Sequence, residues 1–512
     1  MKFTSKKLAI ILQYTQIGLS TAISLIYTPI MLRLLGQGEY GLYSLAGSVI
    51  SYLSLLSLGL GASYIRFYSR YRSKNDEAGI RLLNGTYLLT FLIIALVAFA
   101  GGLLLAFNID KILTTGYTGA EIKLTRTLML VMAVALSWSF PASVFQAYIM
   151  SQECFVFQKL ISLLRTIVNP MLTLPVLFLG YGSLGLVLVS LFLTVFFDAI
   201  CIHYCLSSLK MRFSFHHAGF QLLKEIAPFS LIIAINGIVD QVNWNVDKLI
   251  IAKFLNKESV AIYAVASNIG SLYLVFSVTI SSVFTPRIHR IVSDNQPDKN
   301  KTLTDIFIRI GRVQYILLLL ILTGFIFFGE YFIAHWAGED YLLSYWVIIL
   351  LIFPATIPLI QNAGIEIQRA ENKHKFRMYV YVLMAAVNVI LSIILCQRWG
   401  VLGSTSATTL SIVLANGLIM NLYYHYKIGL DMLRFWKEIA KITLASVPVL
   451  LFGALVIHRL TYSSFFIFIL WIFIYSAIFA GTMLLWGFNA EERQMILAPL
   501  KRILTIRKQA KS

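Results

Sequence analysis

Long apolar stretches recur along the whole chain and are separated by short polar segments. A helix needs about 20 predominantly apolar residues to cross the hydrocarbon core of a bilayer. The pattern therefore predicts an all-α integral membrane protein with about fourteen transmembrane helices. The expected spans are residues 8–34, 41–65, 82–107, 124–150, 158–180, 183–206, 226–253, 259–286, 306–334, 344–368, 377–398, 401–426, 438–458 and 464–487.

Composition supports this interpretation. The chain is 58% hydrophobic and 13% charged, whereas soluble domains carry about 25% charged residues. Three lysines precede the first apolar run, but no small-residue cleavage site follows it, so we interpret the run as a retained span and not as a signal peptide. The four cysteines lie in or beside apolar stretches without metal-ligand spacing, and we expect no metal site.

Basic residues concentrate in alternate loops, near residues 70–81, 210–224, 287–301, 369–377 and 427–437, and in the tail. By the positive-inside rule, these loops and both termini are expected in the cytoplasm. The net charge of +19 then reflects topology and contact with anionic lipid heads, and no nucleic-acid partner is expected. No phosphate-binding GxxxxGK motif occurs, so an ion gradient, the membrane potential or the substrate's own gradient must supply any energy.

Two parts of the sequence repeat. The stretch "LLGQGEYGLYSLAGS" (residues 34–48) aligns with "FLNKESVAIYAVASN" (residues 254–268), and "GSLG" (182–185) aligns with "GVLG" (400–403). Six helices therefore repeat as six helices, which predicts two parallel lobes around a central cavity. We expect the lobes at residues 1–206 and 226–426, two additional helices at 438–487, and a basic cytoplasmic tail at 488–512.

Polar residues form a stripe on the first expected span and on its repeat partner, the seventh. On the first span, successive members stand 3, 4, 4 and 3 residues apart, which places them on one helix face. Because lipid-facing surfaces tolerate such groups poorly, we expect both stripes to line an aqueous cavity that binds substrate. The alternative is that they hydrogen-bond within a lobe and lock helices together. The stripes contain Gln13, Gln16, Ser20, Ser24 and Tyr27, and Asn236, Asp240, Asn243, Trp244 and Asp247.

Arginines at span ends or within spans are the candidate contacts for an anionic substrate, because guanidinium binds phosphate bidentately. Arg66 and Arg287 end the second and eighth spans, whereas Arg165 and Arg312 lie inside the fifth and ninth. Interfacial anchoring is the alternative reading, and it fits most arginines. Arg165 and Arg312 are the two that we favour as binding residues.

The stretches "LGQGEYGLYSLAGSVISYLSLLSLGLGASYIRF" and "NVDKLIIAKFLNKESVAIYAVA" and the repeated GxxG resemble the polysaccharide transporter family, over about residues 1–430. That family lies within the multidrug/oligosaccharidyl-lipid/polysaccharide exporter superfamily. The resemblance implies a flippase, not an enzyme, that moves an undecaprenyl-pyrophosphate-linked oligosaccharide to the outer leaflet of the bacterial inner membrane by alternating access. The oligosaccharide would be an O-antigen, capsule or exopolysaccharide repeat unit.

The implied partners are the lipid-linked oligosaccharide, membrane lipids, and the polysaccharide polymerase and chain-length machinery. The chain departs from the family's cationic cavity, because its two stripes are neutral and acidic. The pyrophosphate contact is therefore expected at the arginines on the cytoplasmic side.

Two rival functions stay open at this point. A cation-coupled multidrug antiporter of the same superfamily would use the acidic stripe of Asp240 and Asp247 for Na⁺, H⁺ or cationic drugs. A glycan polymerase or ligase would need a catalytic outer loop, and no outer loop concentrates Arg, His or Glu. No cofactor is expected, and Na⁺ or H⁺ coupling is left open.

Overall fold

Helices make up almost all of the described chain. The structure is a computed structural model that describes residues 2–57, 59–113, 116–215, 219–294, 298–373, 375–460, 462, 464–490 and 492–494. No strand occurs among these residues, which confirms the predicted all-α class. The expected tail at 488–512 lies outside the described residues beyond position 494.

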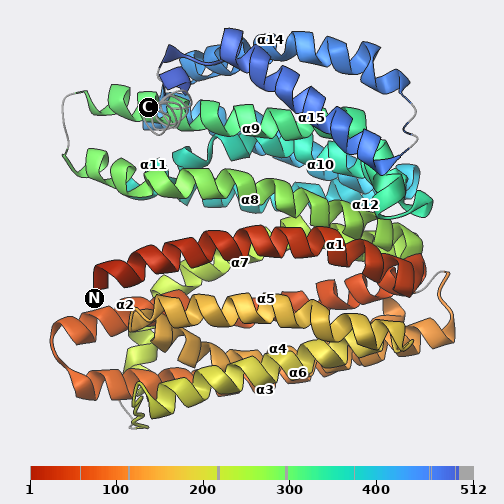
Figure 1. The fold of residues 1–512 in the computed structure, drawn as a ribbon. Coiled ribbons are helices and arrows are strands. Elements are labelled where there is room, and N and C mark those ends of the chain that lie inside the picture. Colours follow the sequence, from red (N-terminus) through yellow and green to blue (C-terminus); the bar gives the residue numbers. More distant parts are fainter. Residues whose placement is uncertain are drawn as a thin grey trace, which may run out of the picture. The chain divides into compact units, whose positions relative to one another are not determined.

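The first of two compact units comprises Met1–Val265, Trp336–Asp340 and Ala385–Ala407. Its helices lie alongside one another in Figure 1, coloured red to yellow-green along the chain. The helices that belong mainly to this unit are α1 (Lys2–Ser51), α2 (Leu60–Ser73), α3 (Glu77–Phe107), α4 (Gly119–Ser151), α5 (Phe155–Phe178), α6 (Gly182–Ser207) and α7 (Gly219–Phe254).

The second unit comprises Ala266–His335, Tyr341–Met384 and Thr408–Ser512. Helix α8 begins in the first unit and α12 passes through it, so both helices are shared. The remaining elements are α8 (Lys257–Asp294), α9 (Lys299–Trp336), α10 (Leu343–Ile360), α11 (Asn362–Ala370), α12 (Lys375–Ile412), α13 (Met420–Tyr423), α14 (Met432–Leu455) and α15 (Phe465–Thr482).

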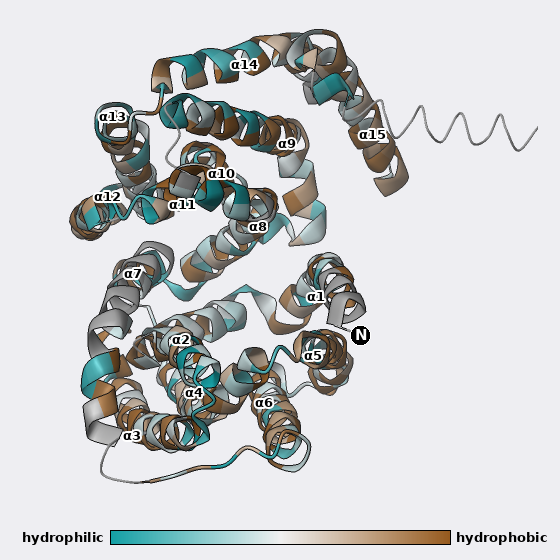
Figure 2. Ribbon diagram, turned by 90° about the vertical axis from the view of Figure 1, so that its left-hand side faces the viewer, coloured by the Kyte–Doolittle hydropathy of each residue, from teal (hydrophilic) through white to brown (hydrophobic). Residues whose placement is uncertain are grey.

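Eleven helical segments of the described chain are long and apolar enough to cross a membrane. Two of them, residues 11–73 and 375–428, each cover two of the expected spans, except for residues 8–10 of the first span. Many apolar side chains on these helices are exposed, and α3 and α6 are brown along much of their length in Figure 2. The chain is therefore a multi-pass membrane protein, while the count of fourteen spans stays a prediction.

Glycines break the two long helices where the sequence predicts a loop. Gly36 interrupts α1 with φ 73° and ψ 164°, and Gly400 interrupts α12 with φ 60° and ψ −140°. A residue with a Cβ is strained at such positive φ values, whereas glycine is not. Gly182, the repeat partner of Gly400, also has a positive φ of 56°.

Non-helical turns between helices recur in the same register. Glu153 and Asn372 both adopt left-handed conformations, and so do Lys210 and Gly429. Each pair is 219 residues apart by its residue numbers. Because few non-glycine residues adopt positive φ, their recurrence supports the internal repeat read from the sequence.

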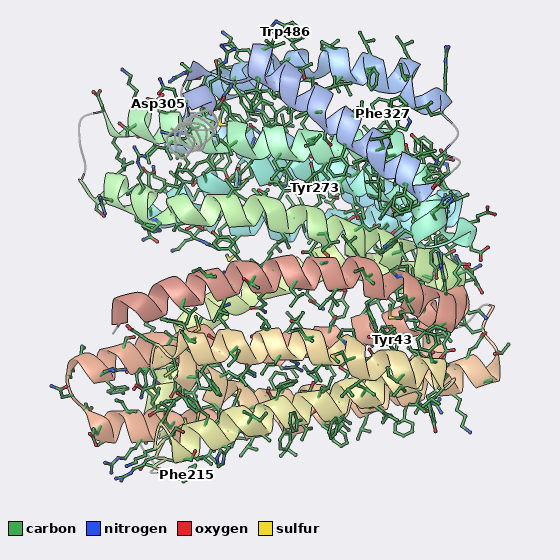
Figure 3. All side chains as sticks on the ribbon, in the orientation of Figure 1. Tyr43, Phe215, Tyr273, Asp305, Phe327 and Trp486 are labelled. Carbon is green, nitrogen blue, oxygen red and sulfur yellow. The ribbon has the colours of Figure 1, made fainter. Side chains whose placement is uncertain are left out.

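Aromatic cores hold each unit together. In the first unit, Tyr64 and Tyr87 meet edge to face with their ring centroids 5.1 Å apart, and both are buried. In the second unit, Phe468 and Tyr475 of α15 pack against Phe328 of α9, and α14 adds Ile442 and Val449 to this core. Figure 3 shows side chains around Phe327 filling the space between these helices. Helix α7 is tied to α2 by a buried contact of 2.6 Å between the hydroxyls of Ser230 and Ser63.

Candidate functional site

A polar groove of about 440 Å³ lies between α1 and α5 in the first unit. It brings together Gln16, Ser20 and Arg165, three of the residues predicted from the sequence to bind substrate. Positions three or four residues apart lie on one face of a helix, and the lining residues of both helices follow that spacing. The complete lining is Gln16, Ser20, Ile23, Ser24 and Tyr27 of α1 with Ser162, Arg165, Thr166, Asn169 and Pro170 of α5.

The hydroxyls of the groove are oriented by their own helices. Ser20 donates to the carbonyl of Ile17 at 2.9 Å, Ser162 to that of Gln158 at 3.0 Å, and Thr166 to that of Ser162 at 2.9 Å. A hydroxyl has two acceptor lone pairs besides its one donor. The groove therefore offers acceptors from Ser and Thr and both donors and acceptors from Gln16 and Asn169.

Arg165 brings the positive charge of the groove. Its guanidinium donates to the hydroxyl of Thr194 on α6 at 2.6 Å. Asp198 on the same helix is buried, accepts from Gln146 at 3.0 Å, and is close enough to interact electrostatically with Arg165. A guanidinium has five N–H donors, so this arrangement fixes its orientation while most donors stay available to a ligand.

A second polar centre surrounds Asp247 of α7. Its carboxylate is 0% exposed and accepts from Tyr263 at 2.8 Å, Ser392 at 2.9 Å and Ser404 at 2.7 Å. The Ser392 hydroxyl also lies 3.2 Å from the amide oxygen of Asn388. A carboxylate, three hydroxyls and an amide oxygen thus converge in a buried cluster that we call the Asp247 cluster.

This geometry corrects the expectation that Asp247 faces a water-filled cavity. The carboxylate is enclosed and accepts hydrogen bonds from hydroxyls of α8 and α12. The break at Gly400 positions one of these donors, because Ser404 lies one helical turn after it. Broken helices at membrane depth commonly supply ion ligands.

Arg312 is also placed differently from the expectation. It is 2% exposed in the second unit and makes a bidentate pair with Glu492, with both distances 2.8 Å. Its remaining nitrogen pairs with Glu438 at 2.8 Å, and the carbonyl of Gly487 accepts at 2.7 Å. Because its donors are used by the protein, Arg312 in this conformation stabilises the C-terminal helices and does not face a ligand.

The other predicted site residues do not join the groove. Arg66 on α2 and Arg287 on α8 are exposed, and neither lines it. The side chains of Asn236, Asp240 and Asn243 lie outside the described residues. Their part of the predicted stripe therefore stays a prediction.

Sequence reasoning missed several members of both centres. Ser162, Thr166 and Asn169 lie at helical spacing around Arg165, and that polar stripe is a signal that could have identified them. Asn388 and Ser392 lie four residues apart in an apolar span, but nothing local in the sequence pairs them with Asp247, which is 145 residues from Ser392.

Comparisons with known proteins agree with the resemblance drawn from the sequence. Residues 30–345 match the family described as "Polysaccharide biosynthesis protein". The chain is 25% identical over 440 residues to the uncharacterized membrane protein EpsK of Bacillus subtilis, covering 83% of each chain. It is 23% identical over 240 residues to the probable low-salt glycan biosynthesis flippase Agl15 of Haloferax volcanii, covering 45% of this chain and 48% of that protein.

Solved structures confirm the fold class. A lipid II flippase MurJ in an inward closed conformation has a TM-score of 0.73 and 17% identity, covering 92% of this chain and 98% of that one. An inward-facing multidrug resistance MATE transporter has a TM-score of 0.62 and 13% identity, covering 78% and 96%. The chain therefore has the fold of these two solved structures, and both the flippase and the antiporter expected from the sequence are compatible with it.

Proposed function

Because this chain belongs to the polysaccharide biosynthesis protein family, in the multidrug/oligosaccharidyl-lipid/polysaccharide exporter superfamily, we propose that it flips an undecaprenyl-pyrophosphate-linked oligosaccharide. The movement would run from the cytoplasmic to the outer leaflet of the bacterial inner membrane by alternating access. The observation that carries the proposal is the groove between α1 and α5, in which one guanidinium stands beside a series of hydroxyls and amides.

The chemistry of the groove suits such a headgroup. A sugar hydroxyl moved into hydrocarbon without a partner costs roughly 2–7 kcal/mol, and an oligosaccharide carries many hydroxyls. Ser20, Ser24, Thr166 and Asn169 can replace their hydrogen bonds to water, and Arg165 can bind the pyrophosphate through charge-assisted hydrogen bonds. The groove lies within the range of about 300–1,000 Å³ that is typical of small-ligand sites, so it would hold one part of the headgroup at a time.

The test compares groove variants with an exposed arginine outside the groove. Arg165→Ala and Gln16→Ala are expected to slow translocation at least about tenfold, whereas Arg459→Ala should not, because one charge-assisted hydrogen bond is worth about 1.5–3 kcal/mol. Arg165→Lys should retain part of the activity, since it keeps the charge without the planar fork.

The assay follows the appearance of the oligosaccharide at the outer face of vesicles with a membrane-impermeant glycan-binding protein. Equal translocation by Arg165→Ala and Arg459→Ala, at equal amounts of folded protein, would remove the groove from the binding site.

We further propose that the Asp247 cluster holds the coupling ion, either Na⁺ or H⁺. Hard cations take oxygen ligands, and this buried cluster offers five side-chain oxygen-bearing groups beside the helix break at Gly400. Asp247→Asn should abolish the response of translocation to an imposed ion gradient. Stimulation by a Na⁺ gradient at constant pH would identify Na⁺, and stimulation by a pH gradient without Na⁺ would identify H⁺. Coupling that survives in Asp247→Asn would exclude the cluster.

A cation-coupled multidrug antiporter is the second candidate, favoured by the buried acidic cluster and by the MATE-like fold. Expression in a drug-sensitive host separates the two functions. Resistance to cationic drugs that is lost in Asp247→Asn would support the antiporter. Accumulation of lipid-linked oligosaccharide in the cytoplasmic leaflet when the protein is deleted would support the flippase.

A further inference from the structure

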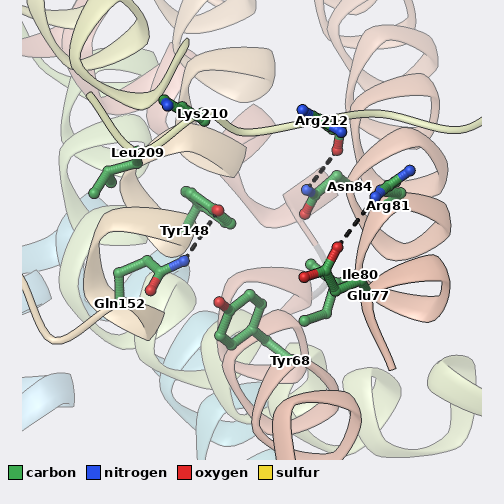
Figure 4. A pocket seen from close by; sticks show the side chains of 10 residues that line it. All are labelled: Tyr68, Glu77, Ile80, Arg81, Asn84, Tyr148, Gln152, Leu209, Lys210 and Arg212. Carbon is green, nitrogen blue, oxygen red and sulfur yellow. Dashed lines mark hydrogen bonds and ion pairs between the residues drawn. The ribbon is translucent and has the colours of Figure 1, made fainter. Parts of the chain in front are cut away.

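A second polar pocket, of about 350 Å³, lies at the end of the first unit where α2, α4 and α6 end and α3 begins. Figure 4 shows it from close by. Its charged lining consists of Arg81, Lys210, Arg212 and Glu77, so cations outnumber carboxylates. The uncharged lining consists of Tyr68, Ile80, Asn84, Tyr148, Gln152 and Leu209.

The floor of the pocket is built and hydrogen-bonded. Asn84 is 1% exposed, and it accepts from the Tyr64 hydroxyl at 2.5 Å. Its amide donates to the backbone carbonyl of Arg212 at 2.8 Å. The Tyr148 hydroxyl accepts from Gln152 at 3.0 Å, as Figure 4 shows. These bonds fix polar groups at the bottom of the pocket, which is the arrangement of a binding site and not of a mobile surface.

The segment that carries two of the cations is held in place by its backbone. Ser214 donates to the carbonyl of Arg81 at 2.9 Å, and the buried Met211 donates to that of Cys205 at 2.9 Å. At Gly85 a Cβ would lie 2.0 Å from the carbonyl oxygen of Ser214, so the segment sits directly on α3. Lys210 and Arg212 are thereby positioned in advance of any ligand.

The charges of Lys210 and Arg212 are not used elsewhere in the described part of the chain. Neither side chain makes a hydrogen bond or ion pair there, whereas Arg81 pairs with Glu77 at 3.1 Å. Arg72, next to the pocket, donates to Gln152 at 3.0 Å. Both side chains are exposed at the pocket, and an anion bound there would pair with them.

The repeat shows a difference at one position of the pocket lining. Aligned on the left-handed residues Glu153 and Asn372, Gln152 of the first unit corresponds to Glu371 of the second. The Glu371 side chain is 5% exposed and pairs with Lys299 at 2.7 Å and Lys373 at 2.9 Å. The second unit thus has a carboxylate, paired with two lysines of its own, at the position where the first unit has a neutral amide.

We propose that this pocket binds the phosphate group of an anionic ligand, through Lys210 and Arg212 with Arg81 at the rim. The phosphate could belong to a lipid headgroup or to a free phosphate, because the two present the same oxygens. Lysine and arginine are the usual phosphate ligands, and the volume of the pocket suits a small group. This site is lined by other residues than the groove between α1 and α5 and does not depend on the proposed transport function.

The test uses the full-length protein in lipid nanodiscs. One arm titrates inorganic phosphate into nanodiscs of phosphatidylcholine and measures binding by ³¹P NMR line broadening. The other arm counts phosphatidylglycerol retained by the protein in native mass spectrometry. Lys210→Gln combined with Arg212→Gln should weaken the binding at least about tenfold for each cation removed. Arg290→Gln combined with Lys437→Gln changes the net charge equally, at exposed positions outside the pocket, and should leave it unchanged.

Gln152→Glu is the sharper variant, because it copies the second unit's carboxylate while leaving the cations and their segment intact. It should weaken binding about tenfold without lowering the melting temperature, which keeps the proposal testable if the double variant unfolds. Pocket-dependent binding in the first arm alone would identify a free phosphate, and in the second arm alone a lipid headgroup. Equal losses in the pocket and control variants, or no binding in either arm, would overturn the proposal.

Discussion

Arg312→Ala tests whether this arginine is a binding residue or a structural one. In the structure its guanidinium joins α9 to α14 through Glu438 and to the segment after α15 through Glu492. Five hydrogen bonds leave the guanidinium, to the two carboxylates, to the carbonyl of Glu438 and to that of Gly487. Alanine removes all of them at once, so we expect the variant to be destabilised before transport is considered.

The magnitude follows from burial. Glu492 is 5% exposed and would keep its charge without its bidentate partner, and removing one member of a buried ion pair costs about 3–5 kcal/mol. Glu492 also accepts from the backbone of Asn489 at 2.9 Å, so the segment after α15 would lose this anchor as well. Lysine has three donors and no fork, so Arg312→Lys should recover only part of the loss.

The assay is a double-mutant cycle on thermal or denaturant unfolding in detergent, with Arg312→Met, Glu492→Leu and the double variant. Replacing both partners by apolar residues of similar volume is often nearly neutral. The double variant should therefore be more stable than either single variant. Translocation is measured alongside. Unchanged stability of Arg312→Ala together with lost translocation would refute this reasoning and return Arg312 to the substrate site.

Three further predictions concern packing, pH and topology. Gly41→Ala should destabilise the first unit by about 1–3 kcal/mol, because its Cβ would lie 2.0 Å from the carbonyl oxygen of Lys257. Gly47 has open space around it, so Gly47→Ala should leave the melting temperature unchanged. Burial by itself would raise the pKa of Glu371, but hydrogen bonds from Lys299 and Lys373 outweigh it and lower the pKa. The ionised Glu371 therefore stabilises the folded chain fully above the unfolded pKa of about 4.3. This stabilisation is lost as the pH falls through the lower pKa of the folded state. The melting temperature of Glu371→Gln should therefore depend less on acid pH than that of the unmodified chain. Reporter fusions should be cytoplasmic after Lys74, Arg212 and Lys375 and external near Thr115 and Asp340, and the reverse pattern would contradict the positive-inside assignment.

The sequence predicts features that depend on short spacings. The apolar stretches indicate which segments lie in lipid. Because every backbone group in lipid must be hydrogen-bonded within the protein, these segments are expected to be helices. The stripe on α1 follows from helical periodicity, and the groove contains its members Gln16, Ser20, Ser24 and Tyr27. These features need only the residues of one helix, so one sequence was enough to find them.

Partners that are distant in the chain could not be predicted in this way. Glu492 is 180 residues from Arg312, and Ser404 is 157 residues from Asp247. No residue near either charge in the sequence indicates its partner, so the sequence alone predicts that a charge within a span faces water. For Arg312 the repeat does not help either, because α14, α15 and the segment beyond them lie outside it.

The number of donors that a buried arginine has left decides whether it can bind a ligand, and the two arginines favoured from the sequence differ in this respect. Charges within spans are costly, and the protein offsets that cost by pairing them. The guanidinium of Arg312 donates hydrogen bonds to two carboxylates and two backbone carbonyls. Arg165 makes one hydrogen bond in the described chain, to Thr194, and lines the groove. Its remaining donors are free to bind phosphate oxygens, and for this reason the groove between α1 and α5 is the better place to look for the substrate.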